Sequence, residues 1–352
     1  MVYMSGDNNL EAFISNDIDT ELAPTGSTGN VQVVALADRA PGGDKSDGDW
    51  TTTKLFHVTP GMTATPSAAV ADWGERDMGN PQTLVDFVTW TKAHYPADHY
   101  ALYFWGHGWS LHPGVVMEDD TNADTLDYHE MKPIMNTLGY MDVVGYDGCN
   151  MASIEIASLW HGHATAMAAS QEWVGWEGIQ YDVVLAKLAA DPSMTADQVA
   201  VATAASATSE KTFSAVAVDG RWDALRTVDN FGIAMKKGAA TNRQAMTKAF
   251  GYTKDMWQAP VDKDLYDMAF EMNDRVSDPT IRSTAQTVMS AEAQDVLYER
   301  HVSQYADAHG ITIFYIAKAA DKTTSWINWS YYPNTIWAAT TQWDDFLNVW
   351  AI

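Results

Sequence analysis

Cysteine is almost absent from this 352-residue sequence: Cys149 stands alone, so the chain can form no internal disulfide bond. Positive charge is also scarce, because 21 Lys and Arg residues face 46 Asp and Glu residues, a formal net charge of −25. Such a surface repels DNA, RNA and anionic lipid, so we exclude nucleic acids and membranes as partners. No uninterrupted apolar run approaches the ~18 residues that span a bilayer.

The first residues, Met1–Gly6, lack the basic and apolar regions of a secretory signal peptide. They resemble the end of a first strand of which only Met1–Met4 remain, and we therefore expect that a preceding leader has been removed. Together with the acidic composition, this favours a secreted, extracellular protein.

Hydrophobic residues make up 46% of the sequence, enough to fill a core, and the length suits one large domain or two smaller ones. Over residues 1–220, short β-branched or aromatic runs alternate with longer helical stretches. This pattern is typical of an α/β fold, a mostly parallel sheet with helices on both faces. Strands are expected at Val31–Ala37, Leu55–Val58, Ala101–Trp105, Val143–Tyr146, Ala164–Ala169 and Ser214–Val218. Helices are expected at Leu10–Ile18, Pro81–His94, Tyr128–Leu138, Met151–Trp160, Asp182–Ala190 and Ala196–Thr208.

From Arg221 onward the pattern turns helical, which predicts a second region at residues 221–352 beside the α/β domain of residues 1–220. No Pro-rich linker separates the two, so we expect the helical region to pack on the sheet. Its helices are expected at Trp222–Lys237, Lys263–Val276 and Arg282–Tyr298, followed by a strand at Gly310–Ile316 and a closing helix at Trp343–Trp350.

Two of the predicted strands end in residues with catalytic chemistry. Ala101–Trp105 is followed by Gly106-His107-Gly108, and Val143–Tyr146 is followed by Asp147-Gly148-Cys149. If both strands belong to one parallel βαβ unit, their carboxyl ends lie side by side, at the edge where open α/β sheets bind ligands. His107 and Cys149 are then expected to converge.

These two residues suit nucleophilic catalysis. A helix that begins at Met151 places Cys149 at its N-terminus, where the backbone dipole favours the thiolate. His107 can take the thiol proton and return it to a leaving amine, and the backbone N–H groups of Gly108 and Cys149 can stabilise an oxyanion. The alternative is structural, because a lone cysteine is commonly buried in the core and a lone histidine at a strand end commonly forms only loop hydrogen bonds.

With these motifs, the sequence resembles the clostripain-type cysteine peptidases, in the caspase-like group that includes gingipains and legumains. The similarity extends over essentially the whole chain. It is carried by Tyr3-Met-Ser-Gly-Asp-Asn-Asn-Leu-Glu11, Tyr103-Phe-Trp-Gly-His-Gly-Trp109, Glu118-Asp-Asp-Thr-Asn122, Tyr146-Asp-Gly-Cys-Asn-Met-Ala-Ser-Ile-Glu155, Ala169-Ser-Gln-Glu172 with Gly178, Tyr181 and Asp182, Gly310–Ile316, and Thr341-Gln-Trp-Asp-Asp-Phe346.

The resemblance implies a caspase-like fold and a cysteine endopeptidase with Cys149 as nucleophile, His107 as acid/base partner and Asp147 at the floor of the pocket for the P1 side chain. Asp147 also makes physical sense there, because a carboxylate two residues before the nucleophile can pair with a bound Arg or Lys, bidentately with Arg. The alternative role for Asp147 is a helix cap or a turn. Polypeptide substrates and a monomer are expected, and no organic cofactor is required.

Further pocket candidates are Glu172 and Asp182, as alternative acids for a basic P1 group, and Trp173 and Trp176, as pocket walls or core residues. Calcium is a candidate ligand of Glu118, Asp119 and Asp120, since the family often responds to calcium, but no EF-hand spacing is present and a solvated acidic loop is the alternative.

Two other functions remain open from the sequence. One is a metal-dependent hydrolase built on His129, His161 and His163, although their spacing matches no zinc helix. The other is a non-catalytic protein- or carbohydrate-binding module that uses surface tryptophans, since the chain has 15 Trp residues scattered through the expected helices and loops.

Overall fold

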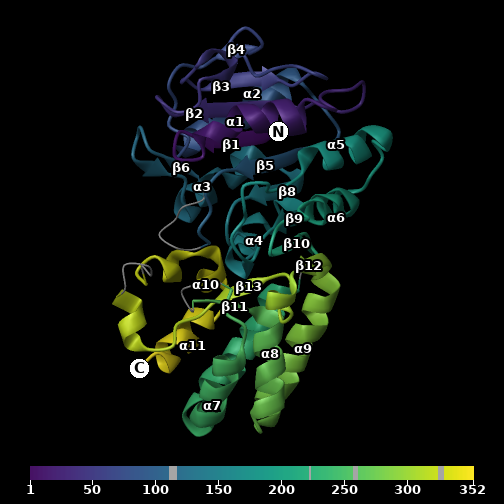
Figure 1. The fold of residues 1–352 in the computed structure, drawn as a ribbon. Coiled ribbons are helices and arrows are strands. Elements are labelled where there is room, and N and C mark those ends of the chain that lie inside the picture. The colour runs from purple at the N-terminus through teal and green to yellow at the C-terminus, as the bar shows by residue number, and fades with distance from the viewer. Residues whose placement is uncertain (111–116, 222, 257–260, 324–328) are drawn as a thin grey trace.

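The computed structural model describes all residues except 111–116, 222, 257–260 and 324–328. A nine-stranded sheet forms its centre, in the order β12-β10-β9-β8-β5-β1-β2-β3-β4 (Figure 1). The inner run from β9 to β2 is parallel, and the strands outside it pair antiparallel. In chain order the strands are β1 Val2–Gly6, β2 Val34–Arg39, β3 Lys54–His57, β4 Ala71–Asp72, β5 Ala101–Trp105, β8 Met141–Asp147, β9 Ala164–Ala169, β10 Thr212–Ala217 and β12 Val296–His301.

Helices cover both faces of this sheet, as expected for the caspase-like fold. Side chains alternate along the inner strands: Leu102 and Phe104 of β5 belong to one buried core, and Tyr103 and Trp105 belong to the other. Helices α2, α3 and α4 add to the first core and α1, α5 and α6 to the second. Their bounds are α1 Glu11–Asp17, which continues into the π-helical turn η1 Ile18–Leu22, α2 Pro81–His94, α3 Tyr128–Leu138, α4 Ile154–Trp160, α5 Tyr181–Ala190 and α6 Ala196–Ser206.

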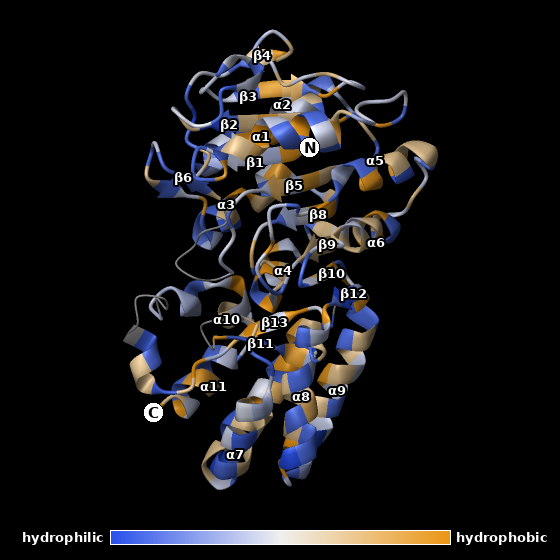
Figure 2. Cartoon of the chain, viewed as in Figure 1, coloured by the Kyte–Doolittle hydropathy of each residue, from blue (hydrophilic) through white to orange (hydrophobic). Residues whose placement is uncertain are grey.

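The C-terminal region is mostly helical and lies beyond one edge of the sheet (Figure 1). Its elements are α7 Ala224–Tyr252, β11 Asp262–Asp264, α8 Leu265–Arg275, α9 Pro279–Asp295, β13 Thr312–Phe314, α10 Ile336–Thr340 and α11 Trp343–Trp350. Figure 2 shows both hydrophobic and hydrophilic residues along α7, α8 and α9, as expected for amphipathic helices that pack against one another. The chain also returns to the main sheet, because β12 pairs with β10. The domain boundary expected at residue 220 falls between β10 and α7 and stays a prediction.

Several expected elements begin and end at the predicted residues: β5, β9, α2, α3 and α11. The helix expected at Arg282–Tyr298 is wrong at its end, because α9 stops at Asp295 and Val296–His301 pair with β10 as β12. The helix expected at Trp222–Lys237 continues to Tyr252 as α7. In the part of the chain that the structure describes, we find no helix whose length and hydrophobicity together would let it span a bilayer.

Candidate active site

The ends of β5 and β8 bring His107 and Cys149 to one place. The two strands are parallel neighbours in which Trp105 pairs with Asp147, and each candidate residue follows two positions later. The N–H of Gly106 also donates to the carbonyl of Asp147 at 3.1 Å, which extends the pairing past the strand ends. Both side chains line one pocket of about 460 Å³, so the convergence expected from the sequence is present in the structure.

The backbones of the two loops are in close contact at Gly108. A Cβ atom added to Gly108 would lie 2.7 Å from the carbonyl oxygen of Cys149 and 3.0 Å from its nitrogen, so only glycine fits here. Within the described residues, neither the N–H of Gly108 nor that of Cys149 has a hydrogen-bond acceptor. Two neighbouring free donors are the arrangement that an oxyanion hole requires.

The thiol of Cys149 is partly buried and accepts a hydrogen bond from the N–H of Val174, at 3.4 Å from Sγ. The expected helix N-terminus is not where it was predicted, because α4 begins at Ile154 with Ser153 as its cap. Residues 150–153 instead bond to other segments: the N–H of Asn150 donates to the Glu172 carbonyl, and that of Ala152 to the Ser170 carbonyl. Burial raises the pKa of the Cys149 thiol to about 11; the hydrogen bond from Val174 acts in the opposite direction, and the carboxylates of Glu210 and Glu172 add to the rise.

The imidazole of His107 is held by an asparagine that the sequence did not single out. Nε2 lies 2.6 Å from Oδ1 of Asn9, and Oε2 of Glu118 lies 3.8 Å from the same nitrogen. An amide oxygen only accepts, so Nε2 carries the proton and Nδ1 is the ring nitrogen left to accept another. Burial lowers the pKa of His107 below its ordinary value, which keeps the ring neutral near pH 7.

Asp147 lines the same pocket. Its side chain is buried, and Oδ1 accepts a hydrogen bond from the N–H of Ile179 at 3.2 Å. A Cβ atom added to Gly178 would lie 2.2 Å from this Oδ1, and its φ of +51° also requires glycine. Burial, and next the Asp17 carboxylate, hold the pKa of Asp147 well above its ordinary value.

The pocket is acidic beyond Asp147. Asp17, Glu177 and Glu210 also line it, against the one lysine among its lining residues, Lys211. Asp17 comes from α1, accepts a hydrogen bond from Trp105 Nε1 at 2.8 Å, and has a pKa that burial raises to about 6. Asp17 could not be singled out from the sequence, because its contact with Trp105 depends on α1 lying over the end of β5.

The other predicted pocket residues divide into two groups. Trp173 and Trp176 both line the pocket, with exposed fractions of 38% and 67%, and Trp176 stacks on Phe13 at 4.9 Å between ring centroids. Glu172 and Asp182 are not among the lining residues. Glu172 binds the hydroxyl of Tyr305 and borders a neighbouring cavity of about 390 Å³, and Asp182 accepts from the N–H of Val183 in the first turn of α5.

The histidines proposed as metal ligands are not gathered into a site. The ring of His129 lies against that of Tyr331 in a tilted contact, and Nδ1 of His161 lies 3.0 Å from the carbonyl oxygen of Val218. Among the described residues, the one close group of metal-ligating side chains contains no histidine. Of the three acidic residues considered for calcium, Glu118 faces His107, Asp119 belongs to that close group, and Asp120 is exposed.

Comparison with known proteins agrees with this fold. A sequence model of the clostripain family matches residues 2–350. Clostripain of Hathewaya histolytica is 26% identical over 219 residues, which cover 54% of this chain and 42% of that protein, so the match spans less than half the length of that relative. A secreted C11 cysteine protease from Bacteroides thetaiotaomicron, solved with an irreversible peptide inhibitor, has a TM-score of 0.71 at 16% identity and covers 98% of both chains. An inactive zymogen C11 protease from Parabacteroides distasonis has a TM-score of 0.68 at 16% identity, over 97% of this chain and 96% of that one.

Proposed function

This chain belongs to the clostripain family, and from that premise we propose that it is a cysteine endopeptidase that hydrolyses peptide bonds after Arg or Lys. The observation that carries the proposal is the position of Asp147: a buried carboxylate in the pocket that also holds His107 and Cys149.

The proposed reaction follows from the protonation states of the two residues. The neutral His107 takes the proton of the Cys149 thiol as Sγ attacks the scissile carbonyl, and the Gly108 and Cys149 N–H groups bind the resulting oxyanion. The imidazolium then gives that proton to the departing amine, which leaves a thioester on Cys149. Water, deprotonated by His107, attacks the thioester, and collapse of this second intermediate releases the carboxylic acid and restores the thiol.

Asn9 has a positioning role in this scheme. By accepting from Nε2, it fixes the tautomer in which Nδ1 has a free lone pair for the thiol proton. The Asn9 amide is neutral, so it stabilises the imidazolium less than a carboxylate would, and His107 can return its proton readily.

The preference for a basic P1 residue follows from the electrostatics of the pocket. Asp147 and Asp17 are buried carboxylates with raised pKa values and no basic partner in the described residues. A guanidinium or ammonium group that enters the pocket supplies the missing positive charge, and its aliphatic stem can pack on Trp173 and Trp176. Glu172 and Asp182 lie outside the pocket, so we assign the P1 charge to Asp147 with Asp17 beside it.

The alternative functions fit the structure less well. Among the described residues, the two strongly exposed tryptophans border the catalytic pocket itself, where a peptide substrate would cover them. A histidine-based metal hydrolase has no gathered ligand set in the described residues. The proposed reaction takes its nucleophile, base and oxyanion donors from the chain, so it needs no organic cofactor. We further propose that the enzyme acts on polypeptides as a secreted monomer.

Covalent labelling tests the proposal. A peptidyl-arginyl chloromethyl ketone should alkylate Cys149, with displacement of chloride and formation of a thioether that mass spectrometry locates on that residue. The matched reagent with a P1 norleucine should react at least roughly 30-fold more slowly, since it lacks the charge that Asp147 pairs with. Equal rates for the two reagents would contradict the basic P1 preference, and no labelling of Cys149 by either would contradict the peptidase.

A further inference from the structure

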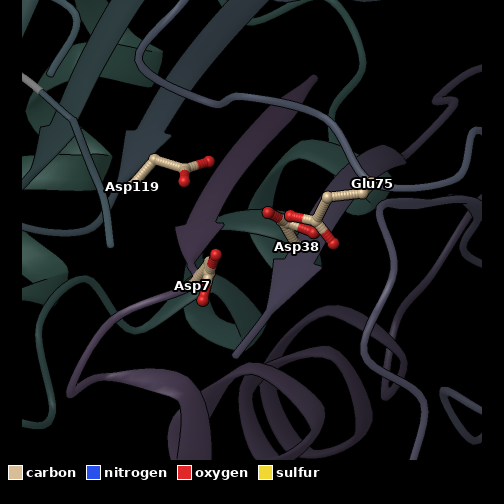
Figure 3. Close-up of side chains that lie close together, drawn as sticks. All are labelled: Asp7, Asp38, Glu75 and Asp119. Carbon is tan, nitrogen blue, oxygen red and sulfur yellow. The ribbon is translucent and has the colours of Figure 1, made fainter. Parts of the chain in front are cut away.

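A second group of acidic residues lies at the ends of the neighbouring strands β1 and β2. Asp7 follows β1, Asp38 lies in β2, Asp119 lies in the short strand β6 Glu118–Asp119, and Glu75 lies in the loop between β4 and α2. Each offers a carboxylate oxygen, and these four oxygens lie within 4.8 Å of one another. Figure 3 shows the four side chains around a shared space.

The carboxylate of Asp38 is the clearest sign that this space takes a ligand. The residue is fully buried. Oδ1 accepts from the Thr53 hydroxyl at 2.9 Å, but Oδ2 is buried with no hydrogen-bond partner among the residues that the structure describes. A buried carboxylate oxygen with no partner is costly, and native proteins keep such groups where an ion or a catalytic role requires them.

The neighbouring carboxylates do not relieve this cost. Asp7 and Asp119 are also buried, and their oxygens accept only from N–H groups, those of Thr121, Met78 and Asn122. Within the described residues, no Lys, Arg or His forms a salt bridge with any of the four. Four carboxylates thus share a small space without a positive charge.

We propose that Asp7, Asp38, Glu75 and Asp119 bind a calcium ion. An all-oxygen donor set selects a hard cation, and Ca–O bonds place opposite ligands about 4.6–5.2 Å apart, compared with about 4.0–4.2 Å for Mg²⁺. The four oxygens all lie within 4.8 Å of one another, so one ion can contact them together. Several carboxylates around one ion are typical of calcium, whereas Mg²⁺ usually takes one or two and keeps several waters. Glu75 is exposed, so the ion can reach the buried carboxylates from its side. The sequence placed a calcium site at Glu118–Asp120, and only Asp119 belongs to the group found here.

The site is joined to the catalytic histidine through two short segments. Asp7 is followed by Asn8, whose amide donates to the Glu118 carbonyl at 3.0 Å, and by Asn9, which holds His107. Asp119 is preceded by Glu118, which lies 3.8 Å from the His107 ring nitrogen. A bound ion would fix both segments and thereby the orientation of His107, a consequence that rests on the proposed function.

Calcium binding can be measured without catalysis. The Cys149→Ala variant, freed of metal with EDTA, is titrated calorimetrically with CaCl2 and separately with MgCl2. We expect one calcium per chain and much weaker binding of magnesium. In the same background, Asp38→Asn and Glu75→Gln should each weaken calcium binding by roughly ten-fold or more, because each removes a ligand charge. Asp120→Asn is the matched control, an acid of the same loop that lies outside the group, and should bind within about two-fold of the parent.

Thermal unfolding gives a second readout. At a calcium concentration of about 100 times Kd, the melting temperature of the parent should rise by roughly 3–4 °C, and the rise should be lost in Asp38→Asn. Glu75 is exposed, so Glu75→Gln keeps the test valid if Asp38→Asn does not fold. No calcium uptake by the parent, or parent-like uptake by Glu75→Gln and Asp38→Asn, would overturn the site. Since this binding needs no thiol, its failure is separate from a failure of the chloromethyl ketone to label Cys149.

Discussion

The pocket that holds Cys149 and the acidic group at β1 and β2 share one electrostatic feature. In both, the ends of adjacent parallel strands carry buried carboxylates without a basic partner in the described residues. Burial raises the pKa of Asp147 well above its ordinary value, and burial with the Glu75 carboxylate raises that of Asp38 to about 9. In both places, a bound positive charge would lower these pKa values and keep the carboxylates ionised.

The size and lining of each place determine which kind of cation it can bind. The pocket around Asp147 has about 460 Å³ of space and aromatic walls, so it suits an organic cation on an aliphatic stem. The four oxygens of the group around Asp38 lie within 4.8 Å of one another, a spacing at which a single ion can contact all of them. In the two proposals, carboxylates at the same edge of the sheet meet different ligands: a side chain where they line an open pocket, and an ion where their oxygens lie close together.

The largest effect is expected from replacing Cys149 or His107, and it tests whether the chemistry takes place in their pocket rather than at the acidic group. Cys149→Ala and His107→Ala should each lower kcat by roughly 10⁴–10⁶-fold, and the double variant should be no worse than either single one, because the two residues act as a unit. Circular dichroism checks that both variants fold. Asp38→Asn should retain measurable turnover in the same assay. If Cys149→Ala kept more than a few per cent of the parent activity, Cys149 would not be the nucleophile. The chemistry could then no longer be assigned to its pocket rather than to the acidic group.

The next largest effect tests whether the Asp147 carboxylate recognises a basic P1 side chain. Asp147→Asn should lower kcat/KM for a P1 Arg substrate by about 30-fold to several thousand-fold, from a loss of roughly 2–5 kcal/mol for a desolvated pair. A neutral P1 substrate should change little. Glu172→Gln is the matched control, since Glu172 is also buried but borders the adjoining cavity. An unchanged Arg preference in Asp147→Asn, together with a loss in Glu172→Gln, would move the P1 charge to the other carboxylate.

The sequence was sufficient to predict that His107, Cys149 and Asp147 lie at one pocket, because each stands at the end of a strand with a clear apolar pattern and parallel neighbours end at the same edge. Their catalytic and P1 roles stay predictions. It could not identify Asn9 or Asp17, because their contacts depend on β1 and α1 lying beside β5, which the chain order does not reveal. Similarly, Asp7, Asp38, Glu75 and Asp119 come from four separate segments with no motif spacing. Val296–Tyr298 continue a helical pattern, and only their pairing with β10 makes them a strand.

A smaller effect is expected from replacing Asn9, which binds His107 and lies two residues after Asp7 of the acidic group. Asn9→Ala should lower kcat by roughly 10–100-fold with little change in KM, since it leaves His107 unoriented. The pH dependence of kcat/KM distinguishes a positioning role of Asn9 from a general disturbance of the structure. His107 must be neutral to accept the thiol proton, so kcat/KM falls as the pH drops through its pKa. Asn9→Asp keeps the acceptor and adds a charge that stabilises the imidazolium, so this acidic limb should move to higher pH. An unmoved limb in Asn9→Asp would contradict the positioning role.

The smallest effect is expected in the segment that joins Asp119 of the acidic group to Asp147 of the pocket. Clostripain-like enzymes commonly cut themselves at a basic residue between the catalytic His and Cys, and between Gly108 and Gly148 the one such residue is Lys132. Lys132 is exposed but lies inside α3, so the chain there cannot easily extend into a cleft. Pro133 follows it, and a bond to proline has a tertiary amide nitrogen and a restricted backbone.

We therefore predict that Lys132→Gln leaves activity and chain length unchanged, because the enzyme does not process itself at this position. It should act either as one chain or after cuts elsewhere. Intact mass spectrometry and denaturing electrophoresis of active enzyme check this, with Cys149→Ala as the uncut reference. A fragment ending at Lys132 that is present in the active enzyme and absent from Cys149→Ala would contradict the prediction. It would also mean that α3 opens far enough to present this bond to the Asp147 pocket of another molecule.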